Sequence, residues 1–380
     1  MRHGKTIEGK TQRVVNKLID DRNVSGYTDL VTPFEQRRMQ PLSQVHSNTV
    51  ISGRKAIAAA LRGEDKRVVL VCGPCSIHDP KAAMEYADRL LTLSNKVKDT
   101  FITVMRVYPE KPRSGMDWRG IANQGLDGSW QRNRGLEITR ELLLYNAKIG
   151  LPSATEFLDP LMPQYISDLI SWSAIGARTV HSQVHRALAS ALSMTVGFKN
   201  DGSGDIVAAI EGMDVARHGQ DFVSERITGV VANVMSRGNR NTHVILRGGT
   251  TRNLVRGPDN NVSVVSTNIP NYDSGTVSLV SDLLKKKDLP SRIMIDCSHS
   301  NSGKDYTKQP EIFMNVIGQI LANKDNIFGI MLESNLKEGS QKVKDGMNGL
   351  VYGVSITDSC IGWETTEEII TKANNMLLRK

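Results

Sequence analysis

Aromatic residues are scarce in this sequence, and no basic stretch is interleaved with them. They make up 5% of the 380 residues, and the tightest basic run is only residues 285–287. Surfaces that bind nucleic acids combine clustered cations with stacking aromatic rings. We therefore expect no nucleic-acid partner, although the net charge is +8. Anionic small molecules stay as candidate ligands.

Cysteines and long apolar runs are also few. The four cysteines, Cys72, Cys75, Cys297 and Cys360, do not form a disulfide framework. A single CxxC at positions 72–75, without a second one, is weak evidence for a structural zinc site. No apolar run approaches the length of a membrane span, and the first residues contain no apolar signal core. These absences predict a cytoplasmic protein without a membrane partner.

The chain divides into a polar beginning and a long patterned remainder. Residues 1–50 predict an N-terminal extension, with a helix over 12–21 and a linker over 43–49. Residues 51–380 predict one catalytic domain. A 380-residue chain with 39% hydrophobic residues can form a core of that size.

Buried strands alternate with amphipathic helices through this remainder. Strands are expected at residues 68–72, 101–107, 152–157, 175–179, 195–199, 243–247, 292–297 and 327–333. Helices are expected at residues 80–94, 135–149, 164–172, 183–192, 206–217, 276–287, 311–323 and 365–378. Eight such units predict an α/β fold, the (β/α)₈ TIM barrel. A hairpin over 222–234 and a long polar excursion over 250–269, after the sixth strand, fall outside this scheme.

The second strand leads directly into a cluster of charges. Arg106, Glu110, Lys111 and Arg113 follow one another within a few residues, and two prolines between them stiffen the turn. Cations held in fixed positions at the end of a strand suit a small molecule with several negative charges.

Barrel enzymes place their chemistry at the carboxyl ends of the strands, and here each expected strand ends in a polar group. Glu156 ends the third strand. Five of the groups are cations that would repel one another unless a compact anion neutralised them. Phosphoenolpyruvate, with one phosphate and one carboxylate, fits this requirement. These cations are Arg106, Lys111, Arg178, Lys199 and Arg247.

A second set at the strand ends has the character of metal ligands. It consists of Cys75, His299, Glu333 and Asp358. One soft, one intermediate and two hard ligands suit a borderline divalent ion such as Mn²⁺, Fe²⁺, Co²⁺ or Zn²⁺, without selecting among them. Such an ion can polarise a carbonyl group as a Lewis acid.

Two other interpretations stay open at this point. Lys199 could be the Schiff-base lysine of a barrel aldolase, although aldolases of that kind need no metal. Alternatively, the chain could bind phosphorylated metabolites or nucleic acid without catalysing a reaction. The complete metal-ligand set argues against both.

The sequence resembles the type I 3-deoxy-D-arabino-heptulosonate 7-phosphate (DAHP) synthases. The resemblance runs from about residue 50 to the end and follows long motifs in order. These include GPCSIHDP (73–80), MRVY-x-EKPRS (105–114), GFKN (197–200), LRGG (246–249), MIDCSHSNS (294–302) and SITDSCIGWE (355–364).

The resemblance implies a metal-dependent, aldol-like condensation of phosphoenolpyruvate with erythrose 4-phosphate, the first step of the shikimate pathway. It also implies a homodimer or a homotetramer. By motif, the metal ligands are Cys75, His299, Glu333 and Asp358. The phosphoenolpyruvate pocket is Arg106, Lys111, Glu156, Arg178, Lys199 and Arg247. Arg113 and Ser114 match the site for the phosphate of the aldehyde. Proton transfer falls to Lys111, His299 or Asp358.

The departures from the family pattern gather on the acceptor side and in the loops. Pro109 stands where an aromatic residue is usual, and Val180 and His181 replace a Thr-Glu pair. The excursion over 250–269 is much longer than usual. These departures suggest an alternative, in which the chain is a paralogue that condenses phosphoenolpyruvate with a different, modified aldose phosphate. Whether an aromatic amino acid inhibits the chain stays open.

Overall fold

The computed structural model describes residues 19–113, 115–256, 261–322, 325–343 and 349–379. Met1–Val31 form one compact unit and Thr32–Lys380 another. Of the helix expected over 12–21, residues 19–21 form a turn and a bend, and the rest lies outside the described residues. Within the described ranges, no helix is long and apolar enough to cross a membrane.

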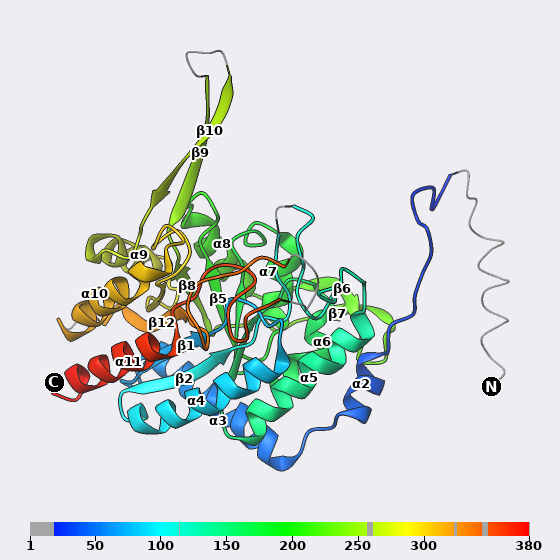
Figure 1. Ribbon diagram of the computed structural model, residues 1–380, viewed down its shortest axis with the longest axis horizontal. Helices are drawn as coiled ribbons and strands as arrows, with labels where there is room; N and C mark the ends of the chain where they lie inside the picture. Colours follow the sequence, from blue (N-terminus) through cyan, green and yellow to red (C-terminus); the bar gives the residue numbers. More distant parts are fainter. Residues whose placement is uncertain (1–18, 114, 257–260, 323–324, 344–348, 380) are drawn as a thin grey trace. The chain divides into compact units, whose positions relative to one another are not determined.

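Eight parallel strands close into a barrel, which confirms the (β/α)₈ fold (Figure 1). Their apolar residues are buried on both faces, as in other all-parallel sheets. Around the barrel the order is β1 (Val68–Gly73), β12 (Ile327–Glu333), β11 (Ile293–Asp296), β8 (Thr242–Leu246), β5 (Thr195–Lys199), β4 (Trp172–Ile175), β3 (Ser153–Glu156) and β2 (Phe101–Arg106).

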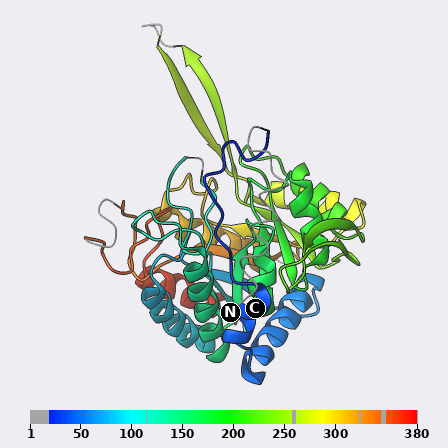
Figure 2. The ribbon, with the colours of Figure 1, turned by 90° about the vertical axis from the view of Figure 1, so that its right-hand side faces the viewer.

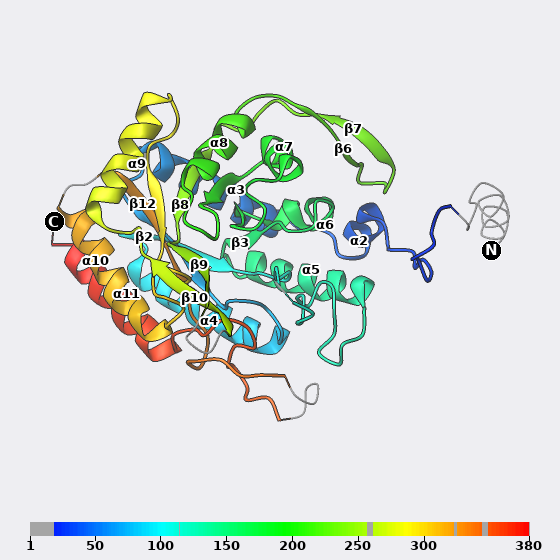
Figure 3. The same ribbon diagram turned by 90° about the horizontal axis from the view of Figure 1, so that it is seen from above.

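Helices surround the barrel in an outer layer (Figure 3). They are α2 (Pro33–Met39), α3 (Gln44–Arg62), α4 (Pro80–Val97), α5 (Arg132–Lys148), α6 (Met162–Ile166), α7 (Gln183–Ala191), α8 (Val207–Ala216), α9 (Ser274–Lys286), α10 (Gln309–Leu321) and α11 (Trp363–Leu377). The described residues also form two short 3₁₀ helices, η1 (Ser167–Leu169) and η2 (Tyr306–Lys308).

Helix α3 replaces the linker expected over 43–49, so that prediction was wrong. Gln44 begins the helix, which runs across residue 50 without a break. Thr49 is buried and its hydroxyl donates to the carbonyl oxygen of Ala147, 2.8 Å away. Ile57 and Leu61 belong to the same buried cluster as the strand residues of the barrel interior. The polar composition of this segment reflects its outer face.

The fourth βα unit is shifted relative to the prediction. A helix was expected over 164–172 and a strand over 175–179, but β4 begins at Trp172 and ends at Ile175. The preceding helical segment ends at Leu169. Two serines, Ser171 and Ser173, are buried here, and they hid the strand from an analysis based on apolar residues. The segment 176–179 instead forms the turn after β4.

One layer of the barrel interior is built from aromatic rings and a histidine. Trp172, His243 and Phe328 come from β4, β8 and β12, which are alternate strands around the barrel. The indole Nε1 of Trp172 donates a hydrogen bond to Nε2 of His243, 2.9 Å away. The rings of His243 and Phe328 meet edge to face, with centroids 4.7 Å apart. Burial lowers the pKa of His243 to about 4.

Two antiparallel hairpins extend from the barrel. The first, β6 (Asp221–Glu225) with β7 (Val231–Met235), confirms the expected hairpin. The second, which we call the β9–β10 ribbon, pairs Gly249–Arg256 with Val262–Ile269 and occupies the expected polar excursion. It projects away from the barrel (Figure 2). Its valines and Leu254 are exposed.

We predict that His243 makes the free energy of unfolding depend on pH. Above pH 6.5 the residue is neutral in both the folded and unfolded states, so its contribution is fully present. Below pH 6.5 the unfolded state takes up a proton that the buried ring resists, so stability is lost as the pH falls toward 4. The free energy of unfolding of wild type exceeds that of His243→Gln by a margin that should shrink by about 2 kcal/mol between pH 7.5 and pH 5.

Equilibrium urea unfolding at both pH values measures this difference. The glutamine keeps an acceptor for Trp172 but cannot be protonated. The matched control is His218→Gln at an exposed histidine, which should follow the wild-type pH profile. An advantage over His243→Gln that stays constant with pH would contradict the prediction.

Candidate active site

A cavity of about 790 Å³ opens where the barrel strands end. It is lined by loops that follow several different strands, which is where TIM-barrel enzymes hold their substrates. The predicted site residues that line it are Lys111, Arg113, Glu156, Arg178, Lys199, Arg247, His299 and Asp358. Ser114 lies outside the described residues. Cys75, Arg106 and Glu333 are buried and contact residues around the cavity.

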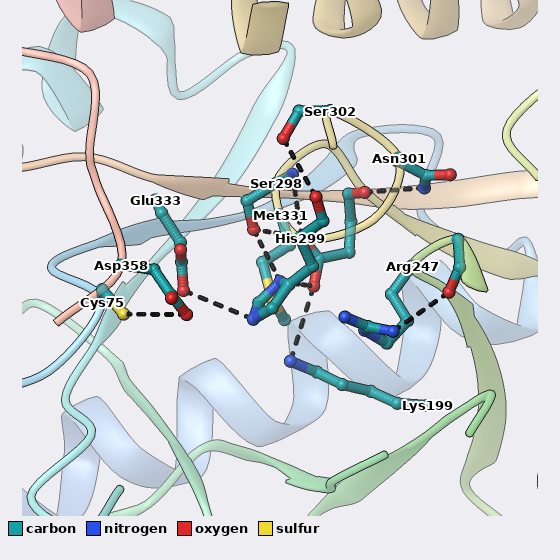
Figure 4. A network of polar contacts seen from close by, with 12 residues as sticks. Cys75, Lys199, Arg247, Ser298, His299, Asn301, Ser302, Met331, Glu333 and Asp358 are labelled. Atoms are coloured by element: carbon teal, nitrogen blue, oxygen red, sulfur yellow. Dashed lines mark hydrogen bonds and ion pairs between the residues drawn. The ribbon is translucent and has the colours of Figure 1, made fainter. Parts of the chain in front are cut away.

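Three of the predicted metal ligands come together at one side of the cavity. Ligand atoms of Cys75, Glu333 and Asp358 all lie within 4.8 Å of one another. Cys75 Sγ lies 3.8 Å from Oδ2 of Asp358. Figure 4 shows these side chains pointing toward one another, with the His299 ring facing them. The donor set fits a borderline divalent ion.

His299 is held by neighbours that leave one ring nitrogen facing this group. Its Nδ1 lies 2.8 Å from the hydroxyl of Ser298 and 2.9 Å from Oδ2 of Asp296. Its Nε2 lies 3.7 Å from Oε1 of Glu333. A histidine whose Nε2 binds a metal usually donates its Nδ1–H to a carboxylate or a backbone carbonyl group. The backbone of His299 has a φ of 58°, a costly conformation that recurs at functional sites.

Lys111 brings a positive charge into the same group. Its Nζ lies 2.8 Å from Cys75 Sγ, 3.9 Å from Asp358 Oδ2 and 4.0 Å from Glu333 Oε1. Burial disfavours the ammonium form, but the interactions with Cys75, Glu333 and Asp358 outweigh burial and raise the pKa of Lys111. Burial and the charge of Glu333 raise the pKa of the Cys75 thiol to about 11. A cation bound here would favour the thiolate instead.

Arg106 contacts this group through Glu333 and is not among the residues that line the cavity. It is fully buried, and its guanidinium donates to Oε1 of Glu333 at 2.9 Å and to the carbonyl oxygen of Pro74 at 3.3 Å. Its guanidinium carbon also lies 4.0 Å from the centroid of the Tyr108 ring. In this position Arg106 fixes Glu333.

Carboxylates neutralise the pocket cations more than the sequence suggested. Lys199 Nζ lies 3.4 Å from Oδ2 of Asp296 and 3.7 Å from Oε2 of Glu156. Burial opposes ionisation of Asp296, but the charges of His299 and Lys199 outweigh burial and hold its pKa well below the usual range. Arg247 has no carboxylate partner of this kind among the described residues, and it donates to the carbonyl oxygen of Gly248 at 3.1 Å. Substrate charge is therefore not the only charge that balances these cations.

The loop after β2 carries the other predicted residues. Arg113 forms an ion pair with Asp117, with Nη2 and Oδ2 3.3 Å apart. Glu110 points away from the cavity and accepts from the backbone N–H of Asp159 at 3.2 Å. Burial raises the pKa of Glu110 to about 7. Glu110 thus braces this loop against the loop that follows β3.

Several cavity residues were absent from the predicted site. They are Tyr108, Asp117, Ser203, Thr250, Thr251, Arg252, Asn253, Ser300 and Lys304. Four of them, Thr250 to Asn253, belong to the excursion that begins directly after the LRGG motif. That proximity to Arg247 is the one signal in the sequence that could have placed them at the site.

The buried pair of Arg106 and Glu333 yields a prediction about stability. Both side chains are almost completely buried, so truncating one leaves an uncompensated charge. Arg106→Ala or Glu333→Ala should lower the free energy of unfolding of the metal-free protein by about 3–5 kcal/mol. The double variant Arg106→Met/Glu333→Leu should recover most of that loss, since both charges are removed together. Urea unfolding in the presence of a chelator measures the effect.

A matched control is Arg62→Ala, which breaks the exposed pair of Arg62 and Glu64. The free energy of unfolding of Arg62→Ala should equal that of wild type within error, because water screens exposed ion pairs. A double variant as unstable as the sum of its single variants would show that the two charges do not depend on each other.

Comparisons with known proteins show the family to which the chain belongs. The model of the DAHP synthetase I family matches residues 44–371. The Phe-sensitive phospho-2-dehydro-3-deoxyheptonate aldolase of Escherichia coli K12 is 44% identical over 362 residues, which cover 95% of this chain and 98% of that protein. The Tyr-sensitive enzyme of the same organism is 43% identical over 349 residues, covering 92% and 93%. A solved structure of phospho-2-dehydro-3-deoxyheptonate aldolase from Francisella tularensis SCHU S4 superposes with a TM-score of 0.86 at 41% identity, covering 94% of this chain and 99% of that one. The chain therefore belongs to the DAHP synthetase I family of enzymes.

Proposed function

We propose that this enzyme condenses phosphoenolpyruvate with erythrose 4-phosphate, giving DAHP and inorganic phosphate. The observation that supports this most strongly is the pairing, in one cavity, of a cation-rich wall with a group of metal-ligand side chains. The names of the relatives support the same reaction. The new carbon–carbon bond joins C3 of phosphoenolpyruvate to the aldehyde carbon, and water adds at C2 before the phosphate leaves.

Phosphoenolpyruvate would lie against the deep cations of the cavity. Lys199 and Arg247 are 3% and 7% exposed, and Arg178 lies nearer the mouth as an exposed residue. Arginine pairs with phosphate and carboxylate in a bidentate manner, and lysine adds a point charge. The amine of Lys199 lies 3.7 Å from Glu156 and 3.4 Å from Asp296, and these ion pairs suit a role in charge stabilisation better than attack on a carbonyl group.

The metal site would be formed by Cys75, His299, Glu333 and Asp358. A divalent ion bound there supplies a Lewis acid for the carbonyl group of the aldehyde. Asp296 and Ser298 hold the His299 ring so that Nε2 faces the donors. Arg106 fixes Glu333 through an ion pair. The protein thus fixes the donors before any ligand arrives.

Three side chains are placed to move protons. Lys111 keeps a proton on Nζ beside Cys75 and Asp358. Burial disfavours the carboxylate of Asp358, but Lys111 and His299 outweigh burial and keep the pKa of Asp358 well below its usual range. We assign Lys111 as the acid that protonates the aldehyde oxygen as the bond forms. Asp358 or His299 then accepts a proton from the attacking water.

Removal of the metal tests the proposal. Consumption of phosphoenolpyruvate in the presence of erythrose 4-phosphate should fall at least 100-fold after treatment with a chelator, because the Lewis acid is lost. Added Mn²⁺ should restore it. Loss of ultraviolet absorbance of phosphoenolpyruvate and release of phosphate measure the rate. The control is the chelator together with a saturating amount of Mn²⁺.

A Schiff-base mechanism predicts the opposite results. Activity would then survive chelation, and borohydride would trap the substrate on Lys199 with a corresponding gain in mass. Either result would contradict the proposal.

One observation supports an alternative identity for the aldehyde substrate. Residues of the β9–β10 ribbon line the cavity, and the family pattern has no such long segment. The alternative is a different, modified aldose phosphate. A side-by-side panel of four- and five-carbon aldose phosphates, with phosphoenolpyruvate saturating, should give erythrose 4-phosphate the highest kcat/KM. A preference of tenfold or more for another aldehyde would favour the alternative.

A further inference from the structure

The base of the β9–β10 ribbon is fixed to two active-site loops. The backbone N–H of Thr250 donates to the carbonyl oxygen of Gly202, 2.9 Å away. Its hydroxyl lies 2.8 Å from the hydroxyl of Ser300, next to His299. A Cβ at Gly249 would lie 2.3 Å from the carbonyl oxygen of Ser203, so only glycine allows the ribbon to approach this loop so closely. The base of the ribbon is therefore part of the cavity wall.

Arg252 is the cation that this wall contributes. It lines the cavity and is exposed. Its backbone pairs with Ser266 in the ribbon, but among the described residues its side chain has no hydrogen-bond or ion-pair partner. Two other cations that line the cavity are partly neutralised, since Arg113 pairs with Asp117 and Lys304 pairs with Asp358 at 3.5 Å. Arg252 can therefore meet an anion without first breaking an ion pair.

The position of Arg252 favours the second substrate over phosphoenolpyruvate. Lys199 and Arg247, the deep cations, are almost completely buried. Arg252 lies on an exposed strand that rises from the barrel (Figure 2). Once phosphoenolpyruvate occupies the deep cations, the aldehyde must lie on the outer side of it. The charged end of the aldehyde then comes within reach of the ribbon.

We propose that Arg252 is a binding residue for the phosphate group of the aldehyde substrate, and that the base of the β9–β10 ribbon forms the outer wall of the acceptor site. This inference rests on the proposed function and adds a residue to it. Thr251 and Asn253, which also line the cavity, supply a hydroxyl and an amide for the sugar hydroxyls.

Two variants of Arg252 and one control variant test the proposal. Arg252→Ala removes the guanidinium, and Arg252→Lys keeps the charge but loses bidentate geometry. The control is Arg256→Ala, which removes the same charge from the same strand. Arg256 lies on the same face of the ribbon four residues farther from the barrel, and it does not line the cavity.

Steady-state kinetics with Mn²⁺ should separate the two substrates. In Arg252→Ala the KM for erythrose 4-phosphate should rise about tenfold or more, as expected for the loss of a hydrogen bond to a charged group. The KM for phosphoenolpyruvate should stay within about twofold. Arg252→Lys should fall between wild type and Arg252→Ala, and Arg256→Ala should match wild type. An equal rise in both KM values, no rise in either, or an Arg256→Ala variant as impaired as Arg252→Ala would overturn the proposal.

A binding measurement separates this inference from the proposed reaction. Glycerol 3-phosphate carries a phosphate but no aldehyde, so it cannot react. Calorimetry with protein loaded with Mn²⁺ and phosphoenolpyruvate should show binding to wild type that weakens about tenfold in Arg252→Ala. If wild type binds it in this way yet does not turn over erythrose 4-phosphate, the proposed reaction fails and the role of Arg252 holds. If wild type and Arg252→Ala bind it equally, or wild type does not bind it, the role of Arg252 is refuted.

Discussion

Two buried carboxylates, Asp296 and Glu333, hold the active site of this barrel together. Each ends a neighbouring strand and contacts more than one positive or ionisable group. Asp296 contacts Lys199 and His299, and Glu333 contacts Arg106 and His299. Neither could be buried as an anion without these partners, because the cost of removing an isolated charge from water is large. The same contacts fix the directions in which the cations and the imidazole point.

These contacts orient two of the four predicted metal ligands, His299 and Glu333, toward the other two. The ring of His299 is oriented from the Nδ1 side (Figure 4), and Glu333 is oriented by its ion pair with Arg106. Orientation by neighbouring groups of this kind raises both affinity for a metal and the precision of its position. The unusual backbone of His299 is tolerated because these contacts over-determine the position of its ring.

The sequence predicted the barrel well because the strands of a parallel sheet are apolar on both faces, and most of their ends agree closely with the observed ones. It failed at β4, where buried serines interrupt the apolar run. It predicted the cations at the strand ends, but Lys199 and Arg106 find their partners on strands one place removed around the barrel, so these pairs depend on the strand order. It also assigned Arg106 to the substrate pocket; this side chain is buried against Glu333 and is not among the residues that line the cavity, so that assignment stays a prediction. The role that we propose for Arg252 depends on how the segment 250–269 folds, and the sequence predicted only a long polar excursion there.

The ribbon begins at Gly249 and ends at Ile269, and these two residues are paired with each other at its base. The barrel is therefore connected to the ribbon through two adjacent points, as it would be to a tight turn. The strands on either side need not move to accommodate the added length, and closing a longer loop costs little additional entropy. A scaffold with this property can gain or lose an entire hairpin beside the cavity while its strands and its core keep their positions. The wall of the cavity and the stability of the barrel can thus change independently in this enzyme.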